Sequence, residues 1–253
     1  MKHASCLLVV LALLSLGGCA ANQAGEQAQQ YSDPKDPLES INRTMWDFNY
    51  DVLDAYILRP TAVVYADYMP QFARTGLLNM ALNLEEPSNS VNNLLQGKVS
   101  GTFVSLGRFL LNSTVGLLGS IDVASKIGLA AEEEEFGEVL GSWGVGTGPY
   151  LMVPAIGPND PRSGVGDYID SAYGPLDSLN IYFSALRFGI KALEARASLI
   201  QQEQQLDNSA DPYSFVKNAY FQNLEYKVKD GKVEKTQEEE SLEDDIDAYL
   251  EGL

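Results

Sequence analysis

The feature that most constrains this chain is a run of 21 uncharged residues, 139–159, broken repeatedly by glycine and proline. Its length alone would suit a membrane helix, which needs about 20 apolar residues. Glycine weakens a helix and proline removes a backbone donor, so a continuous helix is not expected here. The pattern instead predicts a short extended segment or hairpin, centred on residues 150–153 and bounded by tight turns.

Two environments fit such a segment. Non-helical backbone survives at membrane depth only where protein or a water-lined cavity satisfies its polar groups. The alternative is a buried strand and turn in an ordinary soluble core. The residues of this segment leave both interpretations open.

Charge and rare residues exclude several classes of function. The net charge of −18 argues against nucleic-acid partners and against binding held by anionic lipid headgroups. The single histidine is His3, and the two cysteines are Cys6 and Cys19. The rest of the chain therefore lacks the side chains for a Ser-His-Asp site, a Cys-His site or a histidine-ligated zinc. We predict a protein with no catalytic residue, no metal and no cofactor.

The first residues have the pattern of a lipoprotein signal peptide, which we place at 1–18. An apolar run, 7–16, is followed by the sequence LGGC, which resembles the lipobox of bacterial lipoproteins. In that class Cys19 carries the lipid anchor, with acyl chains such as palmitate, and two or more chains make attachment stable. Ala20, in place of an aspartate, favours the outer membrane. An uncleaved anchor or a chance cysteine is the alternative.

Composition divides the rest of the chain into three parts. Residues 19–35 are rich in Gln, Ala and Gly and are expected to be a flexible tether. Residues 36–227 form the folded body. Residues 228–253 are predicted to be an acidic disordered tail, with ten acidic residues against three lysines from Lys229 onward. Such a tail is either a docking arm for a basic partner or a solubilising segment.

The body is predicted to be all-α, with one short hairpin near the glycine-rich run. Apolar residues at spacings of three and four, from 38 to 52, predict a helix that is capped by Asp36 and ends at Arg59-Pro60. Shorter helices follow, broken at Pro70 and at residues 85–87. Three asparagines in this region are expected to be solvated, although a polar cavity is the open alternative; they are Asn89, Asn92 and Asn93.

Residues 99–131 are the most apolar helical region. The uncharged part, 109–121, is too short as a helix to cross a bilayer of about 30 Å. It is either a buried core helix or one that lies partway into a leaflet. The acidic run 132–135 is expected to be an exposed turn. Helices are also predicted within 162–175 and 178–206, and after Asp211-Pro212.

Five ordered segments carry a family resemblance. They read DPLESINRTMWDFNYDVLDAYILRP (36–60), NLEEP (83–87), RFLLNSTVGLLGSIDVA (108–124), FGEVLGSWGVGTGPYLMVP (136–154) and DPYSFVKNAYF (211–221). With these segments the chain resembles the VacJ/MlaA family of outer-membrane lipoproteins, over about residues 36–226. The lipobox cysteine is what that family requires.

The resemblance implies a flat ring of helices in the periplasmic leaflet of the outer membrane. It further implies an amphipathic channel through which misplaced phospholipid leaves the outer leaflet, a trimeric porin that holds the ring, and a periplasmic carrier protein that takes the lipid onward. A hairpin beside the channel maps onto about 143–153. The implied channel residues are Trp143, Gly144, Val145, Gly146, Thr147, Gly148, Pro149 and Tyr150. Of these, Trp143 and Tyr150 are expected at the lipid–water boundary.

Two departures limit what the resemblance implies. Lys217 stands where an arginine is expected, which puts a bidentate contact there in doubt. The acidic tail also differs, so no role is assigned to it. Two other functions stay open: a structural lipoprotein that only stabilises a porin, and an envelope hydrolase. The missing His and Cys and the lack of a G-x-S-x-G elbow argue against the hydrolase, although a Ser/Lys or paired-carboxylate site is not ruled out.

Overall fold

The computed structural model describes residues 33–173 and 181–232, and its chain divides into a unit Met1–Asp33 and a body that starts at Pro34. The predicted signal peptide, Cys19 and nearly all of the predicted tether lie outside the described residues. The predicted tail lies outside them from residue 233 onward.

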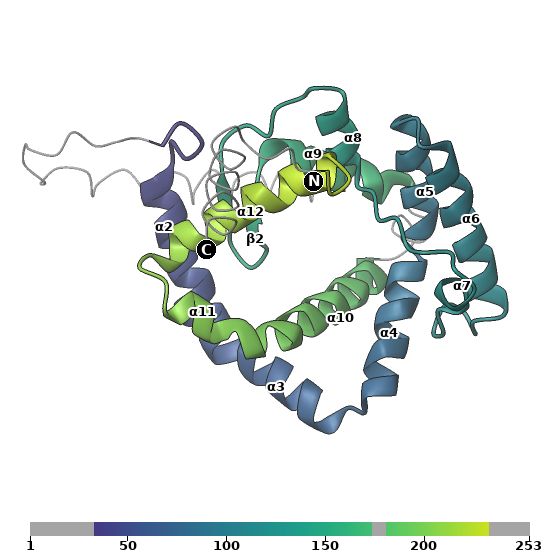
Figure 1. The fold of residues 1–253 in the computed structure, drawn as a ribbon. Coiled ribbons are helices and arrows are strands. Elements are labelled where there is room, and N and C mark those ends of the chain that lie inside the picture. Colours follow the sequence, from purple (N-terminus) through teal and green to yellow (C-terminus); the bar gives the residue numbers. More distant parts are fainter. Residues whose placement is uncertain (1–32, 174–180, 233–253) are drawn as a thin grey trace, which may run out of the picture. The chain divides into compact units, whose positions relative to one another are not determined.

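The body is mainly helical, as predicted (Figure 1). Its first half contains α2 (Glu39–Asp47), η1 (Phe48–Leu58), α3 (Arg59–Tyr68), α4 (Gln71–Asn83), α5 (Glu86–Leu95), α6 (Val99–Thr114) and α7 (Val123–Lys126). Its second half contains α8 (Phe136–Ser142), β1 (Leu151–Val153), β2 (Gly157–Asn159), α9 (Pro161–Tyr173), α10 (Ile181–Leu199), η2 (Ile200–Gln202), α11 (Glu203–Asp207) and α12 (Pro212–Val228). The predicted breaks at Pro70 and at 85–87 are confirmed.

The first helix does not end at Arg59-Pro60, so that prediction is wrong. α2, η1 and α3 form one continuous helical run, and η1 is a π-helix in which the Arg59 N–H donates to the Asp54 carbonyl. A proline in an α-helix clashes with the carbonyl four residues before it, and the wider π turn relieves that clash at Pro60. Asp36 makes no capping bond to this helix either, because its carboxylate is buried in other contacts.

Packing between neighbouring elements closes the helices into a ring. Along the chain α2 packs on η1, α3 on α10, α10 on α4, α4 on α6, and α6 on α5. From there α5 packs on α8, α8 on α9 and α12, and α12 on β2, which pairs with β1 beside α2. Figure 1 shows this circuit, with α10 lying along the inner side of α3 and α4. The predicted helical ring is therefore confirmed.

The hairpin is the only sheet among the described residues. β1 and β2 are antiparallel, with Leu151 opposite Asn159 and Val153 opposite Gly157. Ala155 in the connecting turn has a φ of 64°, and its N–H donates to Asn49 Oδ1 over 2.8 Å. The extended segment predicted from glycine and proline is thus confirmed at Leu151–Val153, whereas the start of the uncharged run, 139–142, belongs to helix α8. The hairpin itself occupies 151–159, so its expected position at about 143–153 is wrong.

A small aromatic core lies where the hairpin meets α2 and α12. Its buried members are Tyr150, Met152 and Tyr213. The rings of Tyr150 and Tyr213 meet edge to face at 5.9 Å, a favourable arrangement for aromatic pairs. Four half-buried side chains pack against this core: Met45, Trp46, Tyr220 and Phe221.

Candidate functional site: an apolar rim around a polar interior

The distribution of side chains is the reverse of that in a water-soluble globule. Among the described residues, 18 polar or charged side chains are buried but only 8 hydrophobic ones. Buried polar groups are usually the minority in soluble proteins, and large exposed apolar surfaces mark contact with a partner or a membrane. The body therefore has a polar interior and an apolar exterior.

Helix α6 shows this reversal most clearly. Its exposed side chains include Phe103, 69% exposed, and Leu110, 62% exposed, while Arg108 is buried. The interpretation of residues 109–121 as a buried core helix is therefore wrong, because the apolar side chains face outward. No helix among the residues that the structure describes is both long enough and apolar enough to cross a membrane.

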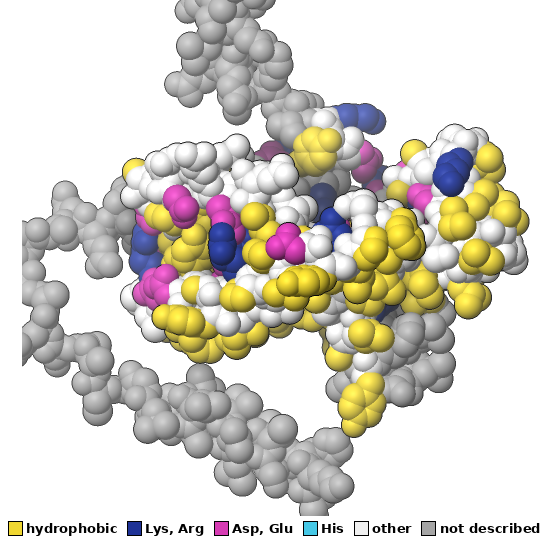
Figure 2. All heavy atoms as spheres, turned by 90° about the horizontal axis from the view of Figure 1, so that it is seen from below, with side chains coloured by type: hydrophobic (Ala, Val, Ile, Leu, Met, Phe, Trp, Pro, Cys, Tyr) yellow, Lys and Arg dark blue, Asp and Glu magenta, His cyan; other side chains and the backbone are white. Residues whose placement is uncertain are grey.

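The exposed apolar side chains continue around the body, and we call them the apolar rim. On α5, α6 and the turn after it they are Val91, Leu94, Leu95, Val99, Phe103, Leu106, Leu110, Val115, Leu117, Leu118 and Ile121. On η1, α3 and α4 they are Phe48, Val52, Tyr56, Ile57, Val64, Tyr68 and Phe72. Figure 2 shows hydrophobic side chains spread over the visible face and gathered at its right, the side on which α6 lies in Figure 1.

The interior on the α5 side is held by amides. Asn92 and Asn93 are fully buried and Asn89 nearly so, so the prediction that these residues are solvated is wrong. The Asn92 amide donates to the Glu134 carbonyl and to Asp170 Oδ1, each over 2.8 Å. These bonds join α5 to the segment before α8 and to α9.

A second polar group joins the start of the body to its last helix. Asp36 accepts hydrogen bonds from the Tyr213 hydroxyl and from Asn42, whose amide also bonds to the hairpin backbone. Lys217 Nζ lies 3.1 Å from Asp36 Oδ2, which is a point-charge contact and not the bidentate fork of an arginine. Asp36 thus joins the first residues of the body to α2 and α12.

A third polar group, which the sequence analysis missed, is centred on Arg108. Its guanidinium bonds to Glu86 on α5, to Asp122 and Ser125 at α7, and to the Leu129 carbonyl. Glu86 and Arg108 are both buried, and burial raises the pKa of Glu86 although Arg108 opposes that shift. The sequence did contain a signal for this group, because Arg108 and Asp122 stand at the two ends of the uncharged run 109–121.

The structure places the predicted channel residues in two environments. Trp143, Gly144, Val145 and Gly146 are exposed, and the Trp143 indole donates to the Leu95 carbonyl over 3.3 Å. Tyr150, in contrast, is fully buried in the aromatic core. Its expected place at a lipid–water boundary is therefore wrong, because its ring packs against α12 and not against solvent.

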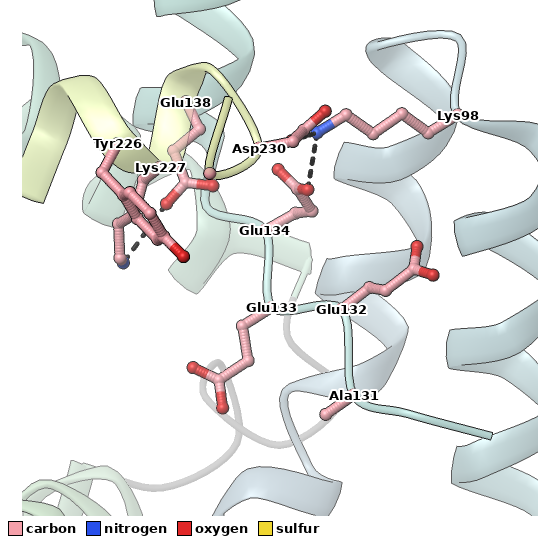
Figure 3. Close-up of a pocket in the computed structure, with 10 residues that line it drawn as sticks. Lys98, Ala131, Glu132, Glu133, Glu134, Glu138, Tyr226, Lys227 and Asp230 are labelled. Carbon is pink, nitrogen blue, oxygen red and sulfur yellow. Dashed lines mark hydrogen bonds and ion pairs between the residues drawn. The ribbon is translucent and has the colours of Figure 1, made fainter. Parts of the chain in front are cut away.

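A cavity of about 480 Å³ lies between α8, the end of α12 and the acidic run (Figure 3). We call it the acidic cavity. Its charged and aromatic lining residues are Lys98, Glu132, Glu133, Glu134, Glu138, Tyr226, Lys227 and Asp230. The exposed turn predicted for 132–135 is confirmed except at Glu134, which is 7% exposed. No set of three or more metal-binding side chains is found among the described residues.

Both lysines of the acidic cavity are held by two carboxylates each. Lys98 pairs with Glu134, at 2.7 Å, and with Asp230, while Lys227 lies 3.3 Å from Glu135 and 3.2 Å from Glu138. Burial raises the pKa of Glu138 to about 8, with Lys227 opposing the shift and Glu134 and Glu135 adding to it. The Glu138 carboxyl therefore gives up its proton at a higher pH than an exposed glutamate does.

Replacing Glu138 by glutamine should change how stability depends on pH. The folded protein holds the Glu138 proton up to about pH 8, whereas the unfolded chain releases it near 4.5. The free energy of unfolding of the native protein should therefore fall as the pH rises between these values, by at most about 1.4 kcal/mol per pH unit. Glu138→Gln should flatten this decline in denaturant titrations at pH 5 and pH 8. Glu133→Gln, at an exposed site, should leave the decline unchanged, and parallel curves for all three proteins would refute the assignment.

Comparison with known proteins agrees with this architecture. The family described as MlaA lipoprotein matches residues 34–227. The chain belongs to the MlaA lipoprotein family. Two relatives carry the name intermembrane phospholipid transport system lipoprotein MlaA. The Haemophilus influenzae protein is 38% identical, over 97% of this chain and 98% of its own length. The Escherichia coli protein is 40% identical, over 93% of this chain and 96% of its own length.

The fold also matches a solved MlaA-family structure. That structure, described as the structural basis for maintenance of bacterial outer membrane lipid asymmetry, superposes with a TM-score of 0.72 at 45% sequence identity. The match covers 76% of this chain and 98% of the other. MlaA relatives are named as components of a transport system and not as enzymes.

Proposed function

We propose that this protein is an outer-membrane lipoprotein that moves phospholipid without chemical change. It is anchored by acyl chains on Cys19 in the periplasmic leaflet. It removes mislocalised phospholipid from the outer leaflet through an amphipathic path and passes it to a soluble periplasmic carrier. A trimeric porin holds the body in place. The names of its relatives, which specify intermembrane phospholipid transport, support this assignment.

The observation that carries the proposal is the reversed polarity of the body. A lipid headgroup needs a wet, polar path, while its acyl chains need an apolar one. A ring whose buried side chains are mostly polar and whose rim is apolar has both kinds of side chain on one body. Helices too short to cross a bilayer still fit within a single leaflet.

Within this proposal residues 143–148, of which all but Thr147 are exposed, border the lipid path. Gly146 is the most informative of them, because a Cβ built on it would meet no atom within 4 Å. A large side chain there fits the fold and extends into the space outside it.

Gly146→Trp should therefore slow lipid removal by about tenfold while leaving the thermal unfolding midpoint within a few degrees of the native value. Gly146→Ala should alter neither property. Gly166→Ala provides the opposite control, because its Cβ would lie 2.3 Å from the Gly137 nitrogen. We expect overpacking at Gly166 to cost about 2 kcal/mol in stability. A Gly146→Trp protein with full transport would remove this segment from the lipid path.

The function itself is tested in cells that lack the gene and carry it back on a plasmid. Phospholipid in the outer leaflet is measured together with lysophospholipid, free fatty acid and porin level. The proposal predicts that surface phospholipid rises without the gene and returns to normal with it, with no lysolipid formed. Unchanged surface phospholipid with porin lost would favour the structural role. Lysolipid that depends on the gene would favour a hydrolase.

A further inference from the structure

We infer that a second cavity, lined by Thr147, Arg162, Lys35 and one face of α12, binds the phosphate group of a phospholipid. We call it the basic cavity. The inference rests on the proposed function and names the residues that hold the phosphate of the lipid. It is carried by a buried guanidinium that lacks an ion pair in the described part of the chain, by the local excess of positive charge, and by the size and place of the cavity.

The buried guanidinium belongs to Arg162, near the start of α9, which is only 9% exposed. Its Nη1 donates to the Val145 carbonyl over 3.1 Å, whereas its buried Nε has no hydrogen-bond partner among the described residues. Within that same part of the chain the guanidinium forms no ion pair. The nearby carboxylate of Asp160 accepts hydrogen bonds from the hydroxyls of Ser163 and Tyr220 instead.

An arginine in this state is unusual on physical grounds. A guanidinium stays charged and carries five N–H donors, and a buried charge is costly unless a partner compensates it. Arg108, the other buried arginine of this body, meets that requirement through Glu86 and Asp122. An anion bound beside Arg162 would supply the missing partner, and the oxygens of a phosphate match the planar fork of an arginine.

The guanidinium lies at the wall of the basic cavity. A Cβ built on Gly141 would lie 2.8 Å from Arg162 Nη1 and 2.6 Å from Val228 Cγ2, so these two side chains pack around the same glycine. Val228 is itself a lining residue of the basic cavity. The charged end of Arg162, and not only its backbone, is therefore beside the cavity.

The local charge favours an anion. Three cationic side chains line the basic cavity, from Lys35, Arg162 and Lys229, against the single carboxylate of Glu225. Glu225 pairs with Lys229 over 2.8 Å, and Lys35 Nζ lies 5.0 Å from the centre of the Phe221 ring. The whole chain carries a net charge of −18, so this excess of positive charge is a local reversal. It would attract a phosphate and repel a cation.

The size and place of the cavity fit a headgroup phosphate and not a whole lipid. Its volume is about 200 Å³, below the range of about 300–1,000 Å³ that complete small-molecule sites occupy. Thr147 belongs both to its lining and to the segment 143–148 that we propose borders the lipid path. A phosphate can therefore enter the cavity while the acyl chains stay outside it.

The test compares a phospholipid with the same lipid lacking phosphate. Full-length acylated protein in a nonionic detergent is equilibrated with equal amounts of phosphatidylglycerol and diacylglycerol of the same acyl chains, and the retained lipids are quantified by mass spectrometry against protein-free detergent. We expect the native protein to retain at least about fivefold more phosphatidylglycerol, equivalent to about 1 kcal/mol. Arg162→Gln should bring the ratio close to one.

A second variant keeps the inference testable if Arg162→Gln does not fold. Lys35 and Lys229 are exposed, so Lys35→Gln combined with Lys229→Gln should fold and should lower the ratio at least about twofold. The control removes two positive charges elsewhere, through Arg59→Gln combined with Lys126→Gln, both at exposed positions, and should keep the native ratio. A native ratio near one, a ratio unchanged by the cavity substitutions, or an equal loss in the control would each overturn the inference.

A further arm separates a lipid phosphate from free phosphate. Inorganic phosphate at about 1 mM should leave the retained phosphatidylglycerol unchanged, because the acyl chains of the lipid add affinity that free phosphate lacks. Displacement of the lipid by inorganic phosphate at that concentration would assign the basic cavity to the free ion and overturn the assignment to a lipid.

The retained ratio does not depend on transport, so the two ideas fail separately. A protein that favours phosphatidylglycerol through Arg162 but does not restore outer-leaflet lipid in cells would refute the proposed function and leave the phosphate site standing. A protein that restores it, with no preference for the phosphate-bearing lipid, would do the reverse.

Discussion

Replacing Arg108 by methionine should lower the free energy of unfolding by about 3–5 kcal/mol, enough to leave little folded protein in the cell. Arg108 is 5% exposed, and it is the cation that faces both Glu86 and Asp122. Its removal would leave the buried Glu86 charge uncompensated and would free the Leu129 carbonyl, 2.6 Å from its guanidinium. Denaturant unfolding in detergent, monitored by far-ultraviolet circular dichroism, gives the measurement.

Two variants show whether the buried charge is the cause. Adding Glu86→Gln to Arg108→Met should recover part of the loss, because the orphaned charge is then gone. Arg59→Met removes an arginine that also pairs with a glutamate, but its side chain is 47% exposed, so it should cost far less stability than Arg108→Met. Equal losses of unfolding free energy for Arg108→Met and Arg59→Met would show that burial of the Arg108 group is not the cause of its effect.

Placing two glutamates on the apolar rim should abolish most lipid removal while leaving the body folded. Phe103 and Leu110 point outward from α6, so Phe103→Glu with Leu110→Glu removes no interior packing. A carboxylate in hydrocarbon is costly, by a few kcal/mol for each charge, so the α6 edge would leave the lipid. We expect outer-leaflet phospholipid in cells to approach the level of the deletion strain, a loss of about tenfold or more in activity.

The matched control places the same charges on α12. Asn218 and Gln222 are exposed and polar, and their replacement by glutamate should leave lipid removal intact. Circular dichroism melting should give similar midpoints for both double variants. A rim variant that still clears phospholipid would mean that α6 does not contact the acyl chains.

The sequence predicted the helices well because local rules govern them. Pro70 and residues 85–87 break the helical pattern whatever surrounds them, and glycine with proline marked the first hairpin strand, Leu151–Val153. Local rules failed at Pro60, where the widened turns of η1 accommodate a proline inside a continuous helix. In addition, α3 packs against α10, a contact that no local pattern records.

Periodicity could not predict whether the apolar face of a helix points to the interior of the body or to its exterior. A helical stripe of apolar residues is the same whether it faces a core or lipid, so Asn92 and Asn93 were expected outside and are inside. The buried pairs of Arg108 and Asp36 join residues 22 and 181 positions apart, respectively. Such contacts follow from the tertiary packing of the helices and not from neighbouring residues in the sequence.

The central claim is that the apolar rim lies among the acyl chains of one lipid layer. The folded body has no native cysteine, so a single fluorophore can be attached through Leu110→Cys on the rim or through Glu133→Cys at the acidic cavity. The labelled proteins are placed in vesicles that contain phospholipid with a nitroxide midway along its acyl chain. The account predicts at least threefold stronger quenching at residue 110 than at residue 133. Equal and weak quenching at both positions would contradict it.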